Sequence, residues 1–309
     1  KRWRYTSGPQ WLSECLLIYK KVIAVAGTHG KTTTTAMIIW LMKQLGFNPG
    51  YLVGGVVNGL TASADIGGSD WFVIEADEYD TAFFDKRSKF VHYYPEILII
   101  NNLEFDHADI FDSLEDILKQ FHILLRTMPS NAYVIANDTD ENIKRLFQKG
   151  QWSQLITFSG KEANWQAKPR VRDGSHFDVV KEDAVVSDVA WSLIGEHNVE
   201  NSLAALAAVT TAGADSNEAI KTLREFKGVK RRLEKFDQVG DVVFYEDFAH
   251  HPTAIRKTLS GLKKHLKANQ RLIVLMELAS FTMRNDTHKN TLMAAFSDAD
   301  NVSILKPNN

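Results

Sequence analysis

The sequence predicts an α/β fold in which helices cover both faces of a mostly parallel sheet. Short apolar runs rich in β-branched residues recur along the chain, segments of helical length follow them, and a glycine-rich turn joins the first such pair. Strands that are buried on both faces form continuous apolar runs, and their alternation with helices is typical of parallel sheets. The same pattern returns near the C-terminus and predicts a second, smaller α/β unit.

The first half of the chain shows this alternation most clearly. The expected strands are Val22–Ala26, Trp71–Ala76, Ile97–Asn101 and Tyr133–Ala136. The expected helices are Lys31–Leu45, Ser113–Thr127 and Asp140–Gln148. Gly46 stands just beyond the first helix, where glycine commonly takes the left-handed conformation that ends a helix.

The region after Trp152 departs from that pattern and then returns to it. Polar turns such as RDGS separate strand-like pieces and predict a small antiparallel element made of Leu155–Phe158, His176–Val180 and Val189–Leu193. Helices are expected next, at Val199–Thr211 and Ser216–Phe226. The second α/β unit follows Gly228, with elements at Val242–Tyr245, Pro252–Leu266, Leu272–Met276, Lys289–Phe296 and Val302–Leu305.

Composition and charge exclude several classes of protein. Hydrophobic residues make up 44% of the 309 residues and charged residues 24%, which is typical of a soluble globular protein. The net charge of −2 gives no basis for binding nucleic acid or an anionic membrane. The longest apolar runs, such as Ala36–Met42, are far shorter than the roughly 20 residues of a membrane span. The single cysteine, Cys15, excludes an internal disulfide framework and fits a reducing, cytoplasmic location.

The turn after the first strand reads GTHGKTTTT and has the composition of a phosphate-binding loop. Gly27 and Gly30 allow the backbone to turn and to point N–H groups at an anion from a helix N-terminus. Lys31 can reach the terminal phosphates of a nucleotide, and Thr32 or Thr33 can bind Mg²⁺. The general pattern has a further glycine that this chain lacks, so a glycine-rich turn that binds no nucleotide is the alternative.

Two acidic loops follow apolar strands and could supply metal ligands. The first carries Glu75, Asp77, Glu78 and Asp80, and the second carries Glu104, Asp106, His107 and Asp109. Carboxylates gathered at one edge of a doubly wound sheet repel one another unless a cation neutralises them, so the pattern favours a metal site. Solvated acidic loops and a structural role for the histidine are the alternatives.

A pair of asparagines near the start of a later helix could bind a nucleotide base. Asn198 and Asn201 are spaced to lie on one face of that helix. Side-chain amides can read the edge of adenine, as they do in base recognition generally. Helix capping explains the same residues equally well.

Basic and polar residues of the C-terminal unit could complete such a site. Arg231 or Arg232 could pair with phosphate, and Asp247 could hold a ribose hydroxyl. The tandem pair His250 and His251 precedes a proline at the expected start of a helix. A structural role for these histidines is the more common outcome.

The order of these motifs resembles that of the Mur ligase family, the ATP-dependent enzymes that form amide bonds in peptidoglycan synthesis. Similar stretches run from about Gly8 to the end of the chain: GTHGKTTT, EADEYD, NNLEFDHADIF, GEHNVENSLAA, RRLE and DFAHHPTAI. The family's own phosphate loop lacks the first glycine, which accounts for Val25 at that position. The resemblance therefore implies ATP and Mg²⁺ as cofactors.

The resemblance also implies roles for individual residues. The nucleotide would be bound by Gly27, Thr28, His29, Gly30, Lys31, Thr32, Thr33, Asn198, Asn201, Arg232 and Asp247. In this set the loop and its lysine would hold the phosphates, the asparagines would contact adenine, and the arginine and aspartate would close on phosphate and ribose. Metal ions would be bound by Thr32, Glu75 and His107. The catalytic residues would be Lys31, Glu75, His107, Arg232 and His250.

The domain organisation that the resemblance implies has three parts. Residues 1–18 would be the linker from an N-terminal UDP-binding domain, residues 19–227 the central P-loop ATPase domain, and residues 228–309 a truncated Rossmann-like ligase domain. Two stretches, IEADEYDTAFFDKRSKFVHY and NNLEFDHADIFDSLEDILKQFH, are most similar to members that join the tripeptide L-Ala-γ-D-Glu-meso-diaminopimelate to UDP-N-acetylmuramic acid in peptidoglycan recycling. L-alanine addition, a catalytically silent nucleotide-binding module and an unrelated P-loop enzyme are the alternatives.

Two positions depart from the family pattern. Many members carry a carbamylated lysine on the helix after the metal-binding histidine, where this chain has His122, and Lys119 is a poor substitute by position. Leu278 and Ala279 stand where relatives would have Pro-Arg before a serine, although Arg284 follows. We therefore expect no carbamate between the metals and the loss of one arginine contact to substrate.

Overall fold

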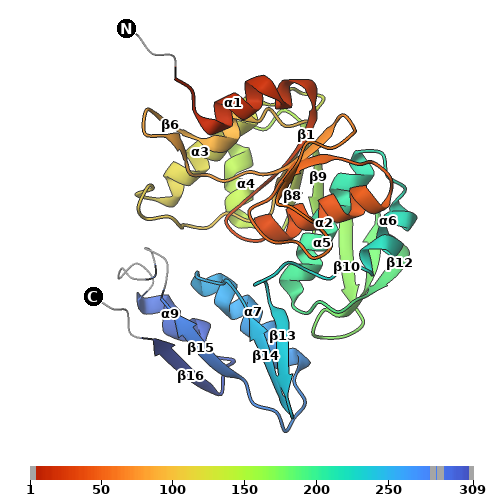
Figure 1. Ribbon diagram of the computed structural model, residues 1–309, viewed down its shortest axis with the longest axis vertical. Coiled ribbons are helices and arrows are strands. Elements are labelled where there is room, and N and C mark those ends of the chain that lie inside the picture. The colour runs from red at the N-terminus through yellow and green to blue at the C-terminus, as the bar shows by residue number, and fades with distance from the viewer. Residues whose placement is uncertain (1–4, 279–282, 284–288, 306–309) are drawn as a thin grey trace.

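The computed structural model describes residues 5–278, 283 and 289–305. Its main feature is a ten-stranded sheet with the strand order β12-β11-β10-β9-β8-β7-β1-β4-β2-β3. Helices lie on both faces of this sheet, and the C-terminal segments form a separate group of strands and helices below it (Figure 1). The expected α/β fold is therefore confirmed.

The centre of the sheet is parallel, as expected. Its strands are β1 (Lys21–Ala26), β2 (Gly50–Leu52), β4 (Trp71–Glu75), β7 (Ile97–Ile100), β8 (Tyr133–Asn137) and β9 (Gln154–Phe158). The prediction that Leu155–Phe158 belongs to an antiparallel element was wrong, since β9 pairs in parallel with β8. The reason is the helix α4 (Glu141–Gln148) between these strands, because a crossover of helical length returns the chain in the same direction.

The two faces of the sheet build two separate hydrophobic cores. In β1, Val22 and Ala24 pack into one core, and Ile23 and Val25 pack into the other. The first core lies under α1 (Gly8–Cys15), α3 (Leu114–Thr127) and α4, and the second under α2 (Lys31–Gln44), α5 (Glu196–Thr211) and α6 (Ser216–Leu223). Burial of both faces explains why these strands are apolar at every position.

The antiparallel element extends the same sheet beyond β9. It consists of β10 (Trp165–Pro169), β11 (His176–Lys181) and β12 (Ala184–Ala190). β10 was not predicted because its sequence, WQAKP, has no β-branched residue and ends in a proline. The last strand begins and ends earlier than the expected Val189–Leu193. A two-residue turn at Glu182 and Asp183, both with positive φ, joins β11 to β12 and fixes this register.

Several short elements were not predicted. They are β3 (Ala64–Asp65), the hairpin β5 (Asp80–Ala82) and β6 (Asp85–Ser88), and the 3₁₀ turns η1 (Leu17–Tyr19) and η2 (Lys89–His92). The stretch expected as a linker contains α1, which packs near η2. Strands of two to four residues carry too little periodicity to be recognised from sequence.

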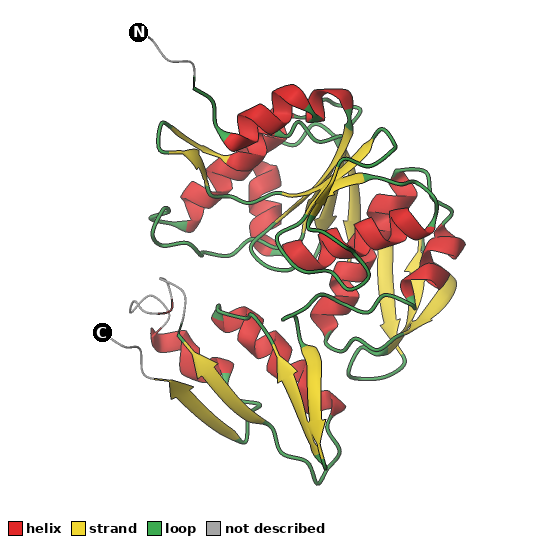
Figure 2. Ribbon diagram, in the orientation of Figure 1, coloured by secondary structure: helices red, strands yellow, loops and turns green. Residues whose placement is uncertain are grey.

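The C-terminal unit, from β13 to β16, contains two small sheets. An antiparallel pair, β13 (Glu234–Val239) and β14 (Val242–Glu246), precedes α7 (Pro252–His265), and a parallel pair, β15 (Ile273–Glu277) and β16 (Asn301–Leu305), flanks α9 (Lys289–Ala295) (Figure 2). Ile255, Leu259 and Phe296 form its core together with Ile194 from the central unit, which comprises β1 to α6. The loss of an arginine contact, expected because Leu278 and Ala279 depart from the family pattern, stays a prediction. Ala279 and Arg284 lie outside the described residues.

Among the residues that the structure describes, no helix combines the length and the apolar character needed to cross a bilayer.

Candidate functional site

The phosphate loop occupies the turn between β1 and α2, at the carboxyl edge of the sheet. Gly27 has φ +124° and Gly30 has φ +83°, which are conformations that favour glycine. A Cβ on Gly27 would lie 2.9 Å from the carbonyl oxygen of Asn102, and one on Gly30 would collide with Oδ1 of Asn201. Both glycines are therefore required for the close packing of this loop, and the loop has the form of an anion cradle at a helix N-terminus.

Two asparagines directly after β7 hold the loop in place. The side-chain oxygen of Asn102 accepts the backbone N–H of His29 at 2.7 Å, and Nδ2 of Asn101 donates to Thr34 Oγ1 at 3.0 Å. Thr28 Oγ1 accepts the backbone N–H of Glu104 at 2.9 Å. The sequence prediction gave these asparagines no role, although two adjacent amides at the end of a buried strand are a recognisable signal.

Thr32 and Glu75 were predicted as metal ligands, and the structure brings them together. Thr32 Oγ1 donates to Glu75 Oε1 at 2.8 Å, while Glu75 Oε2 accepts the backbone N–H of Gly54 at 2.8 Å. A hydroxyl and a carboxylate oxygen are the donors that Mg²⁺ prefers, so these residues fit the implied ion.

Arg232 reaches this pair from the far end of the chain. Its Nη2 lies 3.3 Å from Thr32 Oγ1, and its guanidinium stacks on the Phe248 ring at 5.1 Å. The backbone contact from Lys230 N–H to Val56 O, 2.9 Å long, places the segment after α6 beside the loop after β2. The neighbouring Arg231 instead bonds to Glu246.

Glu78 links two of the predicted catalytic residues, Lys31 and His107. Its carboxylate lies 3.1 Å from Lys31 Nζ and 3.1 Å from His107 Nε2, and its side chain is only 3% exposed. Lys31 Nζ also donates to the carbonyl oxygen of Gly27 at 2.7 Å, which holds it over the loop. The prediction mentioned Glu78 as one of several acids without assigning it this role.

The pKa values of this buried triad shift in the directions that keep all three groups charged. Burial raises the pKa of Glu78, but Lys31 and His107 lower it more, to about 2. Burial lowers the pKa of Lys31, and Glu78 and Asp77 outweigh that effect and raise it. Burial likewise lowers the pKa of His107, but the hydrogen bond to Glu78 outweighs burial, so the pKa of His107 is raised. Such a cluster of buried charges is typical of functional sites.

His107 uses both ring nitrogens in this structure. Its Nδ1 lies 2.7 Å from the Tyr79 hydroxyl, its Nε2 contacts Glu78, and its φ of +57° is unusual for a residue other than glycine. The predicted role of His107 as a ligand of a second metal ion stays a prediction, and it requires one ring nitrogen to exchange its present partner, Tyr79 or Glu78, for the ion.

The remaining predicted residues of the C-terminal unit lie at the turn before α7. Asp247 accepts the backbone N–H groups of Leu233 at 2.6 Å and Ala249 at 2.8 Å, and burial raises the pKa of its carboxyl group. His250 is directed to the carbonyl oxygen of Phe248 at 3.0 Å. Asp247 therefore organises the turn, and a contact to ribose stays a prediction.

The predicted adenine contacts are buried on α5. Asn198 Nδ2 donates to the carbonyl oxygen of Ile194 at 2.8 Å, just before the helix begins, whereas Asn201 lies against the phosphate loop. Burial lowers the pKa of the adjacent His197 to about 4, and Lys257 contributes to the shift. His197 is therefore neutral at physiological pH.

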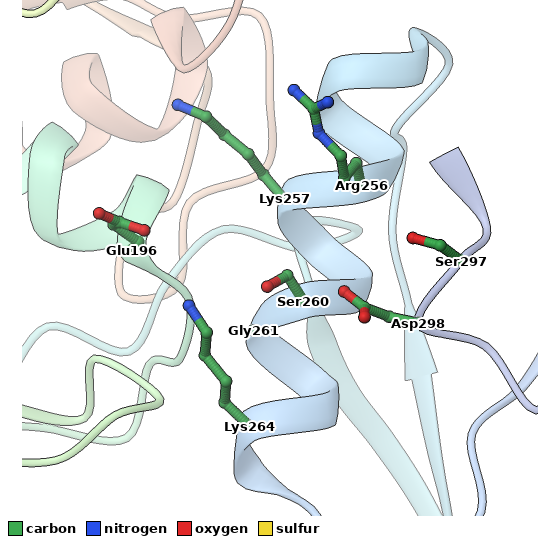
Figure 3. A pocket seen from close by; sticks show the side chains of 8 residues that line it. All are labelled: Glu196, Arg256, Lys257, Ser260, Gly261, Lys264, Ser297 and Asp298. Carbon is green, nitrogen blue, oxygen red and sulfur yellow. The ribbon is translucent and has the colours of Figure 1, made fainter. Parts of the chain in front are cut away.

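A cavity of about 270 Å³ lies between the start of α5 and α7. Figure 3 shows Lys264 extending from α7 toward the segment that carries Glu196, with Ser297 and Asp298 on the other side of the helix. Beside it, Lys257 Nζ donates to Glu200 Oε2 at 2.8 Å and ties the two units together.

A second cavity, of about 460 Å³, opens next to Glu75. Residues of α1 and of the loop after β2 form its apolar wall, and Glu75, Asp77 and Lys89 supply its polar groups. This is the cavity that adjoins the predicted metal ligands, so it has the position of a substrate-binding pocket.

His122, at the position of the family's carbamylated lysine, is remote from these contacts. It stacks on Trp152 with ring centroids 5.9 Å apart, and its Nε2 has no hydrogen-bond partner among the described residues. Lys119 on the same helix is exposed. No contact within the part of the chain described joins either residue to the site.

Comparison with known proteins gives matches along nearly the whole chain. The Mur ligase middle domain matches residues 25–209, and the Mur ligase glutamate ligase domain matches residues 231–309. The UDP-N-acetylmuramate–L-alanyl-γ-D-glutamyl-meso-2,6-diaminoheptandioate ligases of Haemophilus influenzae and Escherichia coli are 46% and 47% identical to the chain over 98% of its length. The chain spans about two thirds of those relatives, 67% and 66%.

A relative of lower identity and a solved structure are also similar to the chain. A UDP-N-acetylmuramate–L-alanine ligase of Caldicellulosiruptor saccharolyticus is 37% identical over 88% of this chain and 59% of its own length. The crystal structure of a murein peptide ligase from Psychrobacter arcticus matches with a TM-score of 0.75 and 42% identity, covering 97% of this chain and 66% of that one. The phosphate loop, the Thr32–Glu75 pair and the two matched domains lead to one conclusion: the chain belongs to the Mur ligase family.

Proposed function

We propose that this chain carries the catalytic part of an ATP-dependent ligase that joins the tripeptide L-Ala-γ-D-Glu-meso-diaminopimelate to UDP-N-acetylmuramic acid. The observation that carries the proposal is the higher identity to relatives named for this tripeptide than to relatives named for L-alanine. The match to the relatives named for the tripeptide covers 98% of the chain. Action in the cytoplasm, as part of peptidoglycan recycling, is part of the same proposal.

The proposed reaction has two steps. A carboxylate oxygen of the muramyl lactyl group attacks the γ-phosphorus of ATP, the bond to the bridging oxygen breaks, and an acyl phosphate and ADP form. The α-amine of the tripeptide then attacks the acyl carbon, inorganic phosphate leaves, and the amine loses a proton. ATP is needed because a free carboxylate is a poor electrophile.

The phosphate loop and the charged triad fit the first step. Lys31 offsets the charge that develops on the transferred phosphoryl group, and Glu78 positions both Lys31 and His107. Thr32 and Glu75 would hold Mg²⁺, which supplies charge neutralisation at the phosphates when bound. Arg232 adds a positive group from the C-terminal unit.

The cavity beside Glu75 is the proposed binding position of the muramyl group. It brings a substrate carboxylate next to the phosphate loop, and Lys89 in its wall could pair with that carboxylate. The apolar wall from α1 and the loop after β2 would help exclude the water that hydrolyses an acyl phosphate.

Release of ADP by the full-length protein tests the proposal. With UDP-N-acetylmuramic acid present, the tripeptide should support release at least about 100-fold better than L-alanine, a difference that multiple peptide contacts readily supply. Faster release with L-alanine would establish the alternative specificity. Binding of ATP without ADP release with either acceptor would identify a catalytically silent nucleotide-binding module.

A further inference from the structure

His29, Glu104 and His251 form a cluster that joins three segments of the chain, and of these only His29 belongs to the predicted nucleotide site. His29 lies in the phosphate loop, Glu104 lies in the loop after β7, and His251 precedes α7 of the C-terminal unit. One oxygen, Glu104 Oε2, lies 3.3 Å from His29 Nε2 and 3.4 Å from His251 Nδ1. All three possible ligand atoms lie within 4.8 Å of one another.

These spacings suit the ligands of a tetrahedral metal ion. Zn²⁺ binds histidine nitrogen and carboxylate oxygen at about 2.0–2.1 Å, so neighbouring ligand atoms around a tetrahedral ion lie about 3.3–3.4 Å apart. Direct charge-assisted hydrogen bonds are shorter, about 2.7–2.9 Å. To bind such an ion, only the two histidine nitrogens would have to move closer together. The centroids of the two rings are 4.7 Å apart.

Hydrogen bonds show which nitrogen of His251 carries its lone pair. Nδ1 accepts the backbone N–H of Thr253 at 3.3 Å, as the N-cap of α7. Nε2 lies 3.3 Å from the carbonyl oxygen of Phe105, to which it can only donate. Nδ1 therefore carries the single lone pair of the neutral ring, and an ion beside Glu104 would take this lone pair in place of the Thr253 N–H. A histidine that binds a metal commonly donates its other N–H to a backbone carbonyl in this way.

The charge and accessibility of the cluster also suit an ion. A glutamate carboxylate is ordinarily ionised at neutral pH, so Glu104 would bring a negative charge to the ion. The side chains of His29 and Glu104 are 20% and 31% exposed, which leaves a path for an ion from solvent.

We propose that His29, Glu104 and His251 bind a divalent transition-metal ion of the Zn²⁺ class, at a site distinct from the Thr32–Glu75 pair. Two imidazoles and one carboxylate leave a fourth tetrahedral position for water. Mg²⁺ prefers octahedral oxygen ligands and discriminates against this donor set. The bound ion ties the phosphate loop to the C-terminal unit and thereby holds the two units together.

Titration of the nucleotide-free, full-length protein with Co²⁺ tests the site. One equivalent should bind with the intense visible absorption of four-coordinate cobalt, persist in excess Mg²⁺ and be displaced by Zn²⁺. Zn²⁺ should also raise the melting temperature, because it binds only the folded arrangement of three separate segments. Absence of a four-coordinate spectrum in the wild-type protein would overturn the proposal.

Variants at the cluster and beside it identify the ligands. His251→Asn removes the imidazole but keeps a side chain that can cap α7, so the protein should stay folded and lose Co²⁺ affinity by at least about 100-fold. Glu104→Gln should have a similar effect. His250→Ala changes the adjacent histidine, which is directed to Phe248, and should bind Co²⁺ as the wild type does. Loss of the spectrum in His107→Ala with full retention in His251→Asn would assign the ion to another site and refute the proposal.

Discussion

The two sides of the candidate site are held in place by different kinds of packing. On the central side, the loops follow β1 and β7, whose residues are almost all buried. On the C-terminal side, β13 and β16 are mostly exposed, and Arg232 and His251 reach the loop region through a few polar contacts. The core therefore fixes the first side, while the second depends on these polar contacts and on the packing of Ile194 against the C-terminal core.

This difference fits an enzyme that must open for its substrates and close around them. Buried strands position the phosphate loop and Glu75 within the well-packed central unit. Polar contacts across a boundary can release at little cost, as domain closure requires. Substitutions on the central side should therefore affect both stability and catalysis, whereas those on the C-terminal side should affect catalysis alone.

The largest effect is expected for Lys31→Ala on the central side. The variant loses the positive charge at the phosphate loop, and ADP release under ligation conditions should fall by about 10³-fold or more. It also leaves Glu78 buried with one cationic partner fewer, so the melting temperature should fall as well. Lys43→Ala, at the end of the same helix, should retain nearly full activity. Near-normal ligation by Lys31→Ala would exclude the proposed reaction.

An acid-dependent loss of stability is expected from Glu78. Its folded-state pKa of about 2 lies below the usual 4.5, so its stabilising contribution is complete above pH 4.5 and is lost as the pH falls toward 2. The shift corresponds to on the order of 3 kcal/mol of unfolding free energy at neutral pH.

Urea unfolding of Glu78→Gln and the wild type between pH 7 and pH 3 measures this contribution. The difference between the two proteins should be largest at neutral pH and should shrink on acidification. Asp77→Asn, a more exposed neighbour, should change stability by less than about 1 kcal/mol. A difference for Glu78→Gln that does not vary with pH would show that the triad is not a charged cluster.

Arg232→Ala probes the C-terminal side and should have the smallest of the three effects. Loss of a charge-assisted hydrogen bond costs about 2 kcal/mol, which corresponds to about 30-fold in kcat/KM for ATP. The melting temperature should stay the same, because the side chain is not part of a core. Arg231→Ala, whose side chain bonds to Glu246, provides a matched control and should leave kcat/KM unchanged. A lowered melting temperature for Arg232→Ala would contradict the distinction between the two sides.

Sequence patterns identified the long elements well and the short ones poorly. β1, α2, β4 and α3 were placed to within one or two residues, because each has a continuous apolar run or a helical repeat with a clear end signal. β10 was missed because it has no β-branched residue and ends in a proline, and β12 was misplaced because its register depends on the turn before it. The direction of β9 depends on the crossover through α4 and not on the strand's own residues.

The sequence by itself determined the chemistry that is present: a glycine-rich phosphate loop, a lysine, acids after two strands, and an arginine from a second unit. Local patterns suffice for this, because each motif depends on residues that are close in the chain. The tertiary structure alone decided which of these groups meet. It selected Glu78 among several acids as the partner of Lys31 and His107, and it joined His29 to Glu104 and His251. Such pairings arise from the order and register of strands far apart in sequence, which no local pattern contains.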